Sequence, residues 1–212
     1  MTKGVCRIRD KFRRIDSHKV YAPSSYLHVT VKELGWLGED VQKEDLPAIL
    51  DVIEEVASEK APFDLGVEGV GIFPSVIYGR VGKGAAEIRR MNLELVERLG
   101  KRAIQSKYDG QSMLPHVSIA HFTTKDVEPL IEETRRLTAR FVGEMRVREI
   151  QVKRSYPHRL FEVPHGVSKR GVVNEPLASF RLGKPNSPSA YRRLDLLHRG
   201  AECYGEVGTA NL

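Results

Sequence analysis

Two histidines in this sequence are each followed, two positions later, by a hydroxyl side chain. His28 precedes Thr30 in the segment LHVTV, and His116 precedes Ser118 in the segment PHVSI. Side chains at positions i and i+2 of a strand point to the same face. We therefore expect each histidine to share a face with its hydroxyl, while the apolar neighbours anchor the strand. If the two strands meet at a groove, two imidazoles and two hydroxyls converge there.

This set of groups suits displacement at a phosphodiester. One neutral imidazole can take a proton from the entering oxygen, and a second, protonated imidazole can donate a proton to the leaving oxygen, because the ordinary pKa of histidine is ~6.5. The hydroxyls of Thr30 and Ser118 can donate hydrogen bonds to the non-bridging phosphate oxygens. No metal and no cofactor are expected, because side chains supply both the acid and the base.

The bare pattern is weak, since on the order of one such match arises by chance in a chain of this composition. A third match, His121-Phe122-Thr123, is interpreted as accidental. The stronger signal is recurrence. The two extended motifs, each with apolar neighbours, fall at the same point of two similar successions of predicted elements.

The first succession begins with the strand that carries His28. Its predicted elements are a strand at 26–34, a helix at 44–59, two strands within 63–82 broken at Pro74, and a helix at 85–106. The second begins with the strand that carries His116. Its predicted elements are a strand at 115–122, a helix at 125–141, and two strands within 143–163 broken at Tyr156-Pro157.

This order predicts a duplication with a unit of roughly 80–90 residues. The expected fold class is α+β. We expect a bilobal, duplicated fold in which two antiparallel sheets face a central cleft, with helices on the outside. We expect residues 1–183 to form this single domain and residues 184–212 to form a basic C-terminal tail.

Three segments resemble a known family, the 2H phosphoesterases, including its 2′-5′ RNA ligase and cyclic phosphodiesterase branch. They are SYLHVTVKELGWLGE, VEGVGIFPSVIYGRVG and LPHVSIAHF, and the resemblance covers about residues 24–182. It implies a bilobal fold with His28 and His116 as the acid and base pair and with Thr30 and Ser118 holding the phosphate. The implied activity opens 2′,3′-cyclic phosphates at RNA or nucleotide ends to 2′-phosphates.

The chain departs from the family pattern in three places. Ser118 replaces the usual threonine and keeps the donor, and His121 stands where a basic arginine often follows the second motif. The segment before His28 is too short and too charged for the usual strand and helix. Either one lobe is trimmed, or residues 4–14 supply the strand without the helix.

Further residues are candidates for substrate contact. Tyr26, Phe73 and Tyr156 can stack on a base, with core or rim packing as the alternative. Arg159 can bind phosphate, with a solvated strand face as the alternative, and His121 is the remaining candidate.

Composition limits the class of protein and its partners. The chain has 212 residues, a hydrophobic content of 41% and a net charge of +6. A basic surface attracts polyanions and is compatible with RNA. No apolar run approaches the ~20 residues that span a bilayer, and the charged first ten residues lack a signal-type apolar stretch. We expect a cytoplasmic monomer that binds RNA or a nucleotide with a cyclic phosphate and no membrane.

Two alternatives to a cyclic phosphodiesterase stay open at this point. One is an RNA 2′-5′ ligase, which would run the same acid and base pair in the joining direction. The other is a non-catalytic RNA-binding protein that uses the same cleft and the basic ends of the chain.

Overall fold

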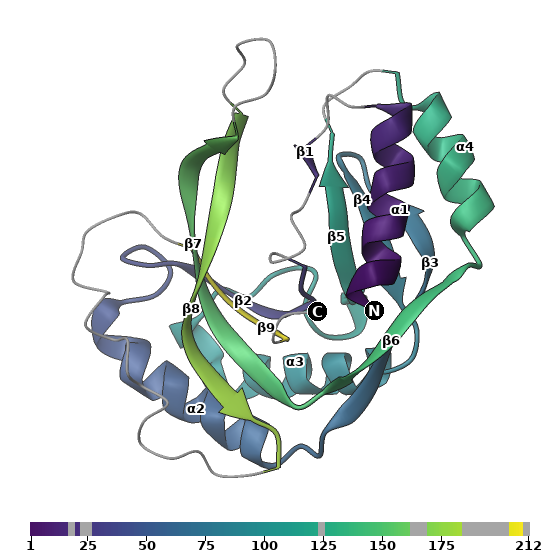
Figure 1. Cartoon of the computed structure of the whole chain (residues 1–212). Coiled ribbons are helices and arrows are strands. Elements are labelled where there is room, and N and C mark those ends of the chain that lie inside the picture. Colours follow the sequence, from purple (N-terminus) through teal and green to yellow (C-terminus); the bar gives the residue numbers. More distant parts are fainter. Residues whose placement is uncertain (17–19, 22–26, 123–125, 162–168, 184–203, 210–212) are drawn as a thin grey trace.

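The chain folds around two antiparallel β-sheets, as a computed structural model shows (Figure 1). The structure describes residues 1–16, 20–21, 27–122, 126–161, 169–183 and 204–209. Helices pack against both sheets, so the predicted α+β class with antiparallel sheets is confirmed.

The first sheet has five strands. In spatial order they are β1 (Val20–Tyr21), β5 (His116–His121), β4 (Val76–Val81), β3 (Phe63–Ile72) and β6 (Phe141–Val147). The predicted strand pair around Pro74 is β3 and β4, joined by a tight turn in which the Phe73 amide donates to the Val76 carbonyl at 2.8 Å.

The second sheet has four strands. In spatial order they are β2 (Thr30–Trp36), β9 (Tyr204–Thr209), β7 (Glu149–Phe161) and β8 (Lys169–Arg181). The predicted break at Tyr156-Pro157 is wrong, because β7 runs through both residues and the break before it falls at Arg148. Among the described residues, Pro157 is paired with Val172 of β8.

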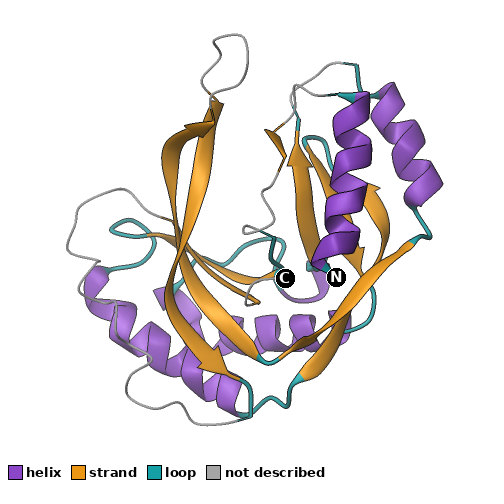
Figure 2. Ribbon diagram, in the orientation of Figure 1, coloured by secondary structure: helices purple, strands orange, loops and turns teal. Residues whose placement is uncertain are grey.

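In the described part of the chain, four α-helices cover these sheets, and Figure 2 shows them in two groups. They are α1 (Thr2–Ile15), α2 (Leu46–Ser58), α3 (Ala85–Leu99) and α4 (Glu128–Leu137). Helices α1 and α4 lie side by side against the five-stranded sheet, whereas α2 packs on α3 and β8, and α3 packs on β2. Short 3₁₀ turns lie at Lys43–Asp45, Gly100–Arg102 and Gly110–Ser112. No helix in the described part of the chain is long and apolar enough to cross a membrane.

The N-terminal segment is helix α1, so the expectation that residues 4–14 supply a strand is wrong. Val5, Ile8 and Phe12 are buried, with exposed fractions of 0%, 2% and 0%. Their spacing of three and four residues forms one apolar stripe of a helix. The outer face of α1 carries the basic residues, which is why the segment appeared too charged for a helix in the sequence.

The middle helix, predicted over 85–106, ends at Leu99. Gly100 follows with φ of 55°, in the left-handed region where a glycine commonly terminates a helix. The chain between α3 and β5 is therefore a long connection, and it reaches back to the strand of the first motif, as described below.

Residues 204–209 fall in the segment predicted as a tail, yet they form β9, between β2 and β7. The remaining tail residues, 184–203 and 210–212, lie outside the described residues. Because the segment that connects residue 183 to β9 is not described, the domain boundary at residue 183 stays a prediction.

Buried apolar side chains from both sheets and from all four helices belong to one hydrophobic core cluster. Val29 and Val117, the central residues of the two histidine motifs, are both 0% exposed within it. The core thus fixes the backbone of both motifs.

Candidate active site

The two histidine motifs lie next to one another because Val29 and Val117 form an antiparallel β-bridge. Residues directly opposite one another in such a pair project to one side, and their neighbours project to the other. With both valines buried in the core, the four polar side chains share the opposite, partly exposed face: His28, Thr30, His116 and Ser118. A single bridge between β5 and the entrance of β2 therefore brings the motifs together.

The ring of His116 is oriented by its own backbone. Its Nδ1 lies 2.8 Å from the Leu114 carbonyl oxygen. A carbonyl only accepts, so Nδ1 carries the proton, and in the neutral ring the Nε2 lone pair is left to accept one. Phe73 and Tyr78 flank the imidazole edge-on, with ring centroids at 5.2 Å and 5.5 Å. The histidine is thus held in one tautomer and one orientation.

Several groups set the charge of His116. Partial burial lowers its pKa below the ordinary histidine value, and the positive charge of His28 lowers it further. The hydrogen bond to Leu114 and the carboxylate of Glu33 act in the opposite direction and raise it, but by less. The net lowering favours a neutral His116 near neutral pH, so its Nε2 is available as a base.

A β-bulge follows the hydroxyl in both motifs, at the same position. The pairing of β2 with β9 shifts between Thr30 and Lys32, so Val31 is the extra residue. The pairing of β5 with β4 shifts between Ser118 and Ala120, so Ile119 is the extra residue. Bulges re-aim the side chains that follow them and are common beside active sites.

The bulge at Ile119 brings His121 onto the face of the site. Strict alternation would have turned it away, since it lies five residues after His116. Desolvation around its ring and then the charge of His116 lower the pKa of His121, although its side chain is exposed at the surface. The lowering caused by His116 shows that the two rings are electrostatic neighbours.

The bulge at Val31 likewise changes which residue of β2 lies on the face of the site. Alternation from His28 and Thr30 would have set Lys32 beside them, but Lys32 is buried, with an exposed fraction of 2%. Glu33 is half-buried instead, and its charge reaches His116. Residue alternation alone misses Glu33, because nothing in the sequence marks the extra residue.

Tyr78 is a second residue that the sequence analysis missed. It stacks on Phe73 with ring centroids 4.1 Å apart and contacts His116 edge-on. Gly71 lies directly opposite it, and a Cβ at that position would clash with the Tyr78 ring. A glycine inside a strand often marks such a close approach, so Gly71 was the signal available in the sequence.

A family model described as the 2′-5′ RNA ligase superfamily matches residues 5–157. This chain belongs to that superfamily. The resemblance to 2H phosphoesterases drawn from its motifs is therefore confirmed.

Relatives within the superfamily carry a functional name. An RNA 2′,3′-cyclic phosphodiesterase of Methanothermobacter thermautotrophicus is 27% identical over 153 residues, which are 71% of this chain and 81% of the relative. One of Archaeoglobus fulgidus, with the same name, is 30% identical over 133 residues, which are 61% of this chain and 70% of the relative.

Solved structures share the fold. The protein TT0787 of Thermus thermophilus matches with a TM-score of 0.63 at 21% identity, over 87% of this chain and 93% of that one. LigT of E. coli, crystallised with 3′-AMP, matches with a TM-score of 0.57 at 14% identity, over 84% of this chain and 92% of that one. At these identities the two structures show a shared fold with this chain.

Of the other residues predicted to contact substrate, the structure places one beside the motifs and does not describe the side chains of the rest. Phe73 contacts His116, as described. Tyr26 lies outside the described residues, and Tyr156 and Arg159 belong to β7, of which only the backbone is described there. Among the described residues, no cluster of three or more His, Cys, Asp or Glu is arranged to hold a metal ion.

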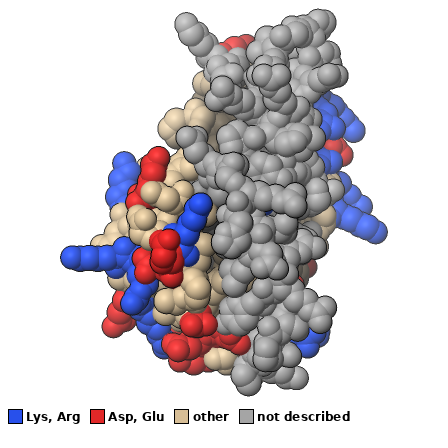
Figure 3. Space-filling view, turned by 90° about the vertical axis from the view of Figure 1, so that its left-hand side faces the viewer, with Lys and Arg blue, Asp and Glu red and all other residues tan. Residues whose placement is uncertain are grey.

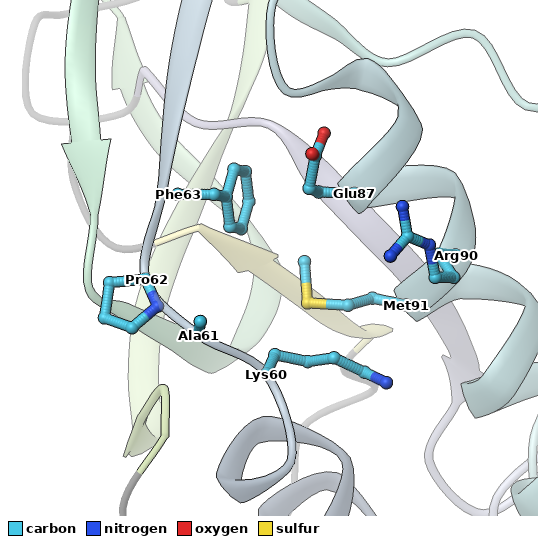
Figure 4. Close-up of a pocket in the computed structure, with 7 residues that line it drawn as sticks. All are labelled: Lys60, Ala61, Pro62, Phe63, Glu87, Arg90 and Met91. Carbon is cyan, nitrogen blue, oxygen red and sulfur yellow. The ribbon is translucent and has the colours of Figure 1, made fainter.

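A pocket of about 240 Å³ lies away from these motifs, between the start of β3 and α3 (Figure 4). Its lining shares no residue with the site and consists of Lys60, Ala61, Pro62, Phe63, Glu87, Arg90 and Met91. Lys60 pairs with Glu94 of α3 at 2.5 Å, so the basic group at its edge already has an acidic partner.

Proposed function

We propose that this chain is a phosphodiesterase that opens 2′,3′-cyclic phosphates at RNA or nucleotide ends and leaves 2′-phosphates. The observation that carries the proposal is the bridge between Val29 and Val117, which sets two histidines and two hydroxyls on one partly exposed face. The functional name shared by the relatives supports the same substrate class.

The geometry of His116 favours the role of general base for the hydrolytic direction. Its Nδ1 is committed to the Leu114 carbonyl, so its Nε2 accepts a proton from water as the water oxygen bonds to phosphorus. The P–O3′ bond then breaks, and His28 gives a proton to the departing 3′ oxygen. The 2′-phosphate remains, and proton exchange with water restores both rings.

Thr30 and Ser118 are proposed to hold the phosphate. Each is next but one to a histidine on the shared face, so its hydroxyl can donate to a non-bridging oxygen where negative charge builds up. Serine in place of threonine keeps that donor. The reaction needs no metal in this scheme, and activity is expected to persist in the presence of a chelator.

The central test replaces each histidine. His28→Ala and His116→Ala are each expected to lower kcat for a 2′,3′-cyclic nucleotide by at least about 100-fold, because each removes one proton-transfer partner. The melting temperature of each variant reports whether the fold survives. Hydrolysis at the wild-type rate by a folded variant would contradict the proposal.

The identity of the product tests the direction and the bond broken. A 2′-phosphate is expected, and a 3′-phosphate would mean that the P–O2′ bond is broken instead. The joining reaction of a 2′-5′ ligase would use the same two histidines in reverse. A non-catalytic RNA-binding protein would bind RNA equally well with or without them.

Phe73, with Tyr78 behind it, is proposed as a platform for the base or ribose of the substrate, and Tyr26, Tyr156, Arg159 and His121 remain candidate contacts. Phe73→Ala is expected to raise KM and to lower kcat, because the ring also flanks His116. Phe141→Ala is the matched control, since that ring is 61% exposed on the outer strand β6. Equal kinetic effects of both substitutions would contradict this role.

The bilobal, duplicated plan is also part of the proposal. The two motifs share their order of residue types and the position of the bulge, after Thr30 in one and after Ser118 in the other. Shared irregularities support a common origin of the two halves better than shared regular strands do. One chain supplies both motifs, so the expected active unit is a monomer.

A further inference from the structure

Behind the first motif lies a polar cluster formed by the buried Lys32 and Asn92 and the partly buried Asp109. Lys32 and Asn92 are 2% and 1% exposed. The Lys32 ammonium donates to Asp109 at 2.7 Å and to the Ile104 carbonyl at 2.5 Å. The Asn92 amide nitrogen donates to the other Asp109 oxygen at 2.9 Å.

The cluster reaches the bulge of the first motif. The same Asn92 amide nitrogen donates to the Val31 carbonyl at 2.8 Å. Val31 is the extra residue of the bulge, where the regular ladder is interrupted. Lys32 follows it directly and points to Asp109 because the bulge turns it inward. Asn92 and Lys32 therefore hold the irregular backbone that immediately follows His28 and Thr30.

The cluster also holds the connection that leads to the second motif. Asp109 accepts from the Ser106 amide at 2.9 Å, and the Gly110 amide donates to the Asn92 side chain at 2.7 Å. Three residues beyond Gly110, the Met113 carbonyl accepts from Arg89 of α3 at 3.0 Å. The next carbonyl, that of Leu114, is the one that orients His116.

An ion pair with a fully buried member is an expensive way to stabilise a fold, and here the Lys32 side chain is 1% exposed and that of Asp109 is 13% exposed. Replacing such a pair by apolar residues of similar size is often neutral or stabilising. Burial alone would raise the pKa of Asp109, but hydrogen bonds from Asn92 and Lys32 outweigh it, so the pKa is lowered and the carboxylate stays charged. What the pair provides is fixed geometry between two segments far apart in sequence.

We propose that Lys32, Asn92 and Asp109 are positioning residues, which lock the strand of His28 and Thr30 to the loop that orients His116. This inference rests on the proposed function for its kinetic consequence, but its structural consequence stands alone. Loss of the cluster is expected to let the two motifs shift relative to one another. A displacement of about 1 Å between reacting groups can cost about 100-fold in rate.

The decisive variant removes both charges together. Lys32→Met leaves the partly buried Asp109 without its ionic partner, and Asp109→Asn leaves the buried Lys32 ammonium without its own, so each alone is expected to lower the melting temperature. The double variant Lys32→Met/Asp109→Asn is expected to recover much of that melting temperature, while kcat stays about 10- to 100-fold below wild type. If kcat recovers in step with the melting temperature, the cluster is merely structural and the proposal is overturned.

A spectroscopic measurement separates this proposal from the proposed function. The ¹H–¹⁵N spectrum of the His116 ring is expected to show the Nδ1–H tautomer in the wild type and a mixture of tautomers in the double variant. A wild type that hydrolyses no cyclic phosphate would defeat the proposed function and leave this measurement intact. An unchanged tautomer in the double variant would overturn the positioning role.

Two further variants complete the design. Should the double variant not fold, Asn92→Ala leaves the ion pair in place, removes the bonds to Val31, Asp109 and Gly110, and is likewise expected to lower kcat and to mix the His116 tautomers. Lys60→Met is the matched control, because it breaks a different pair of a lysine and a carboxylate, that with Glu94 of α3, remote from both motifs. It is expected to leave kcat and the His116 tautomer unchanged, and an equal loss there would overturn the proposal.

Discussion

In the proposed mechanism His116 can serve as the base only while its ring is neutral, and its immediate neighbours set the pKa that decides its charge. Burial and His28 lower its pKa, whereas Leu114 and Glu33 raise it. In the folded protein the ring therefore becomes protonated at a lower pH than a free histidine does. The pH at which activity falls on the acid side is consequently a direct report on this environment.

Replacing Glu33 with glutamine tests that environment. The change removes a carboxylate that raises the pKa of His116, so this pKa is expected to fall further. The acid limb of kcat/KM, which reports the base in the free enzyme, should move to lower pH. Profiles of wild type and Glu33→Gln over the same pH range make the comparison, and an acid limb that moves upward or stays in place would contradict it.

The types and spacing of residues were enough to identify the two motifs, because i and i+2 share a face of any strand. They were not enough to find Glu33 or Tyr78. Glu33 reaches the site only through the bulge at Val31, and Tyr78 only through a cross-strand contact over Gly71. Both depend on pairings between strands distant in sequence.

At the scale of elements, strongly periodic segments were predicted well and irregular ones were not. The helix at 44–59 and the strands on either side of Pro74 appear close to their expected bounds. The basic residues of the N-terminal segment masked the apolar stripe of α1. Strand β7 continues through Tyr156-Pro157 because it pairs with β8 there, and the local sequence around these residues does not predict that pairing.

Helix α1 is expected to contribute to stability through its buried stripe. Phe12→Ala should lower the free energy of unfolding by about 3–5 kcal/mol, because it leaves a cavity where the ring is fully buried. Ile15→Ala, at a side chain 39% exposed on the same helix, is the control and should change it by less than about 1 kcal/mol. Denaturant unfolding measures both, and equal losses would show that α1 does not depend on this stripe.

At the scale of the whole molecule, the net charge of +6 is not spread as a uniform basic surface. On the face shown in Figure 3, basic and acidic side chains lie intermingled among the described residues. Helix α1 instead carries Arg13 and Arg14 in its last turn and no acidic residue in its first turn. A polyanion would therefore be attracted unevenly around the molecule.

Salt is expected to distinguish RNA from mononucleotide substrates. Each phosphate contact releases counterions, so affinity for a longer RNA falls more steeply with salt. The value of kcat/KM for an oligonucleotide with a 2′,3′-cyclic end should decrease more with added salt than that for a cyclic mononucleotide. The mononucleotide is the internal control, and parallel decreases would show that no contact extends beyond the terminal phosphate.

The arrangement of the sheets was predictable in class but not in order. Two antiparallel sheets follow from the repeated succession of strands and helices. The insertion of β9 between β2 and β7 does not, because residues 204–209 are separated from the rest of the sheet by a segment rich in polar residues and proline. Pairing between strands that are far apart in the chain is the feature that a single sequence predicts least well.

The extra residue after each hydroxyl determines on which face of the strand the next side chains lie. Up to Thr30 and Ser118, even-numbered residues lie on the face of the two histidines, and after the extra residues Val31 and Ile119 the odd-numbered Glu33 and His121 lie there. Removing either extra residue would exchange the faces of the side chains that directly follow it, which in β2 extend to the second register shift, between Glu33 and Gly35. In β2 this would bring the ammonium of Lys32 to the imidazoles and bury the carboxylate of Glu33. These two stretches should therefore tolerate a change of side chain far better than a change of length.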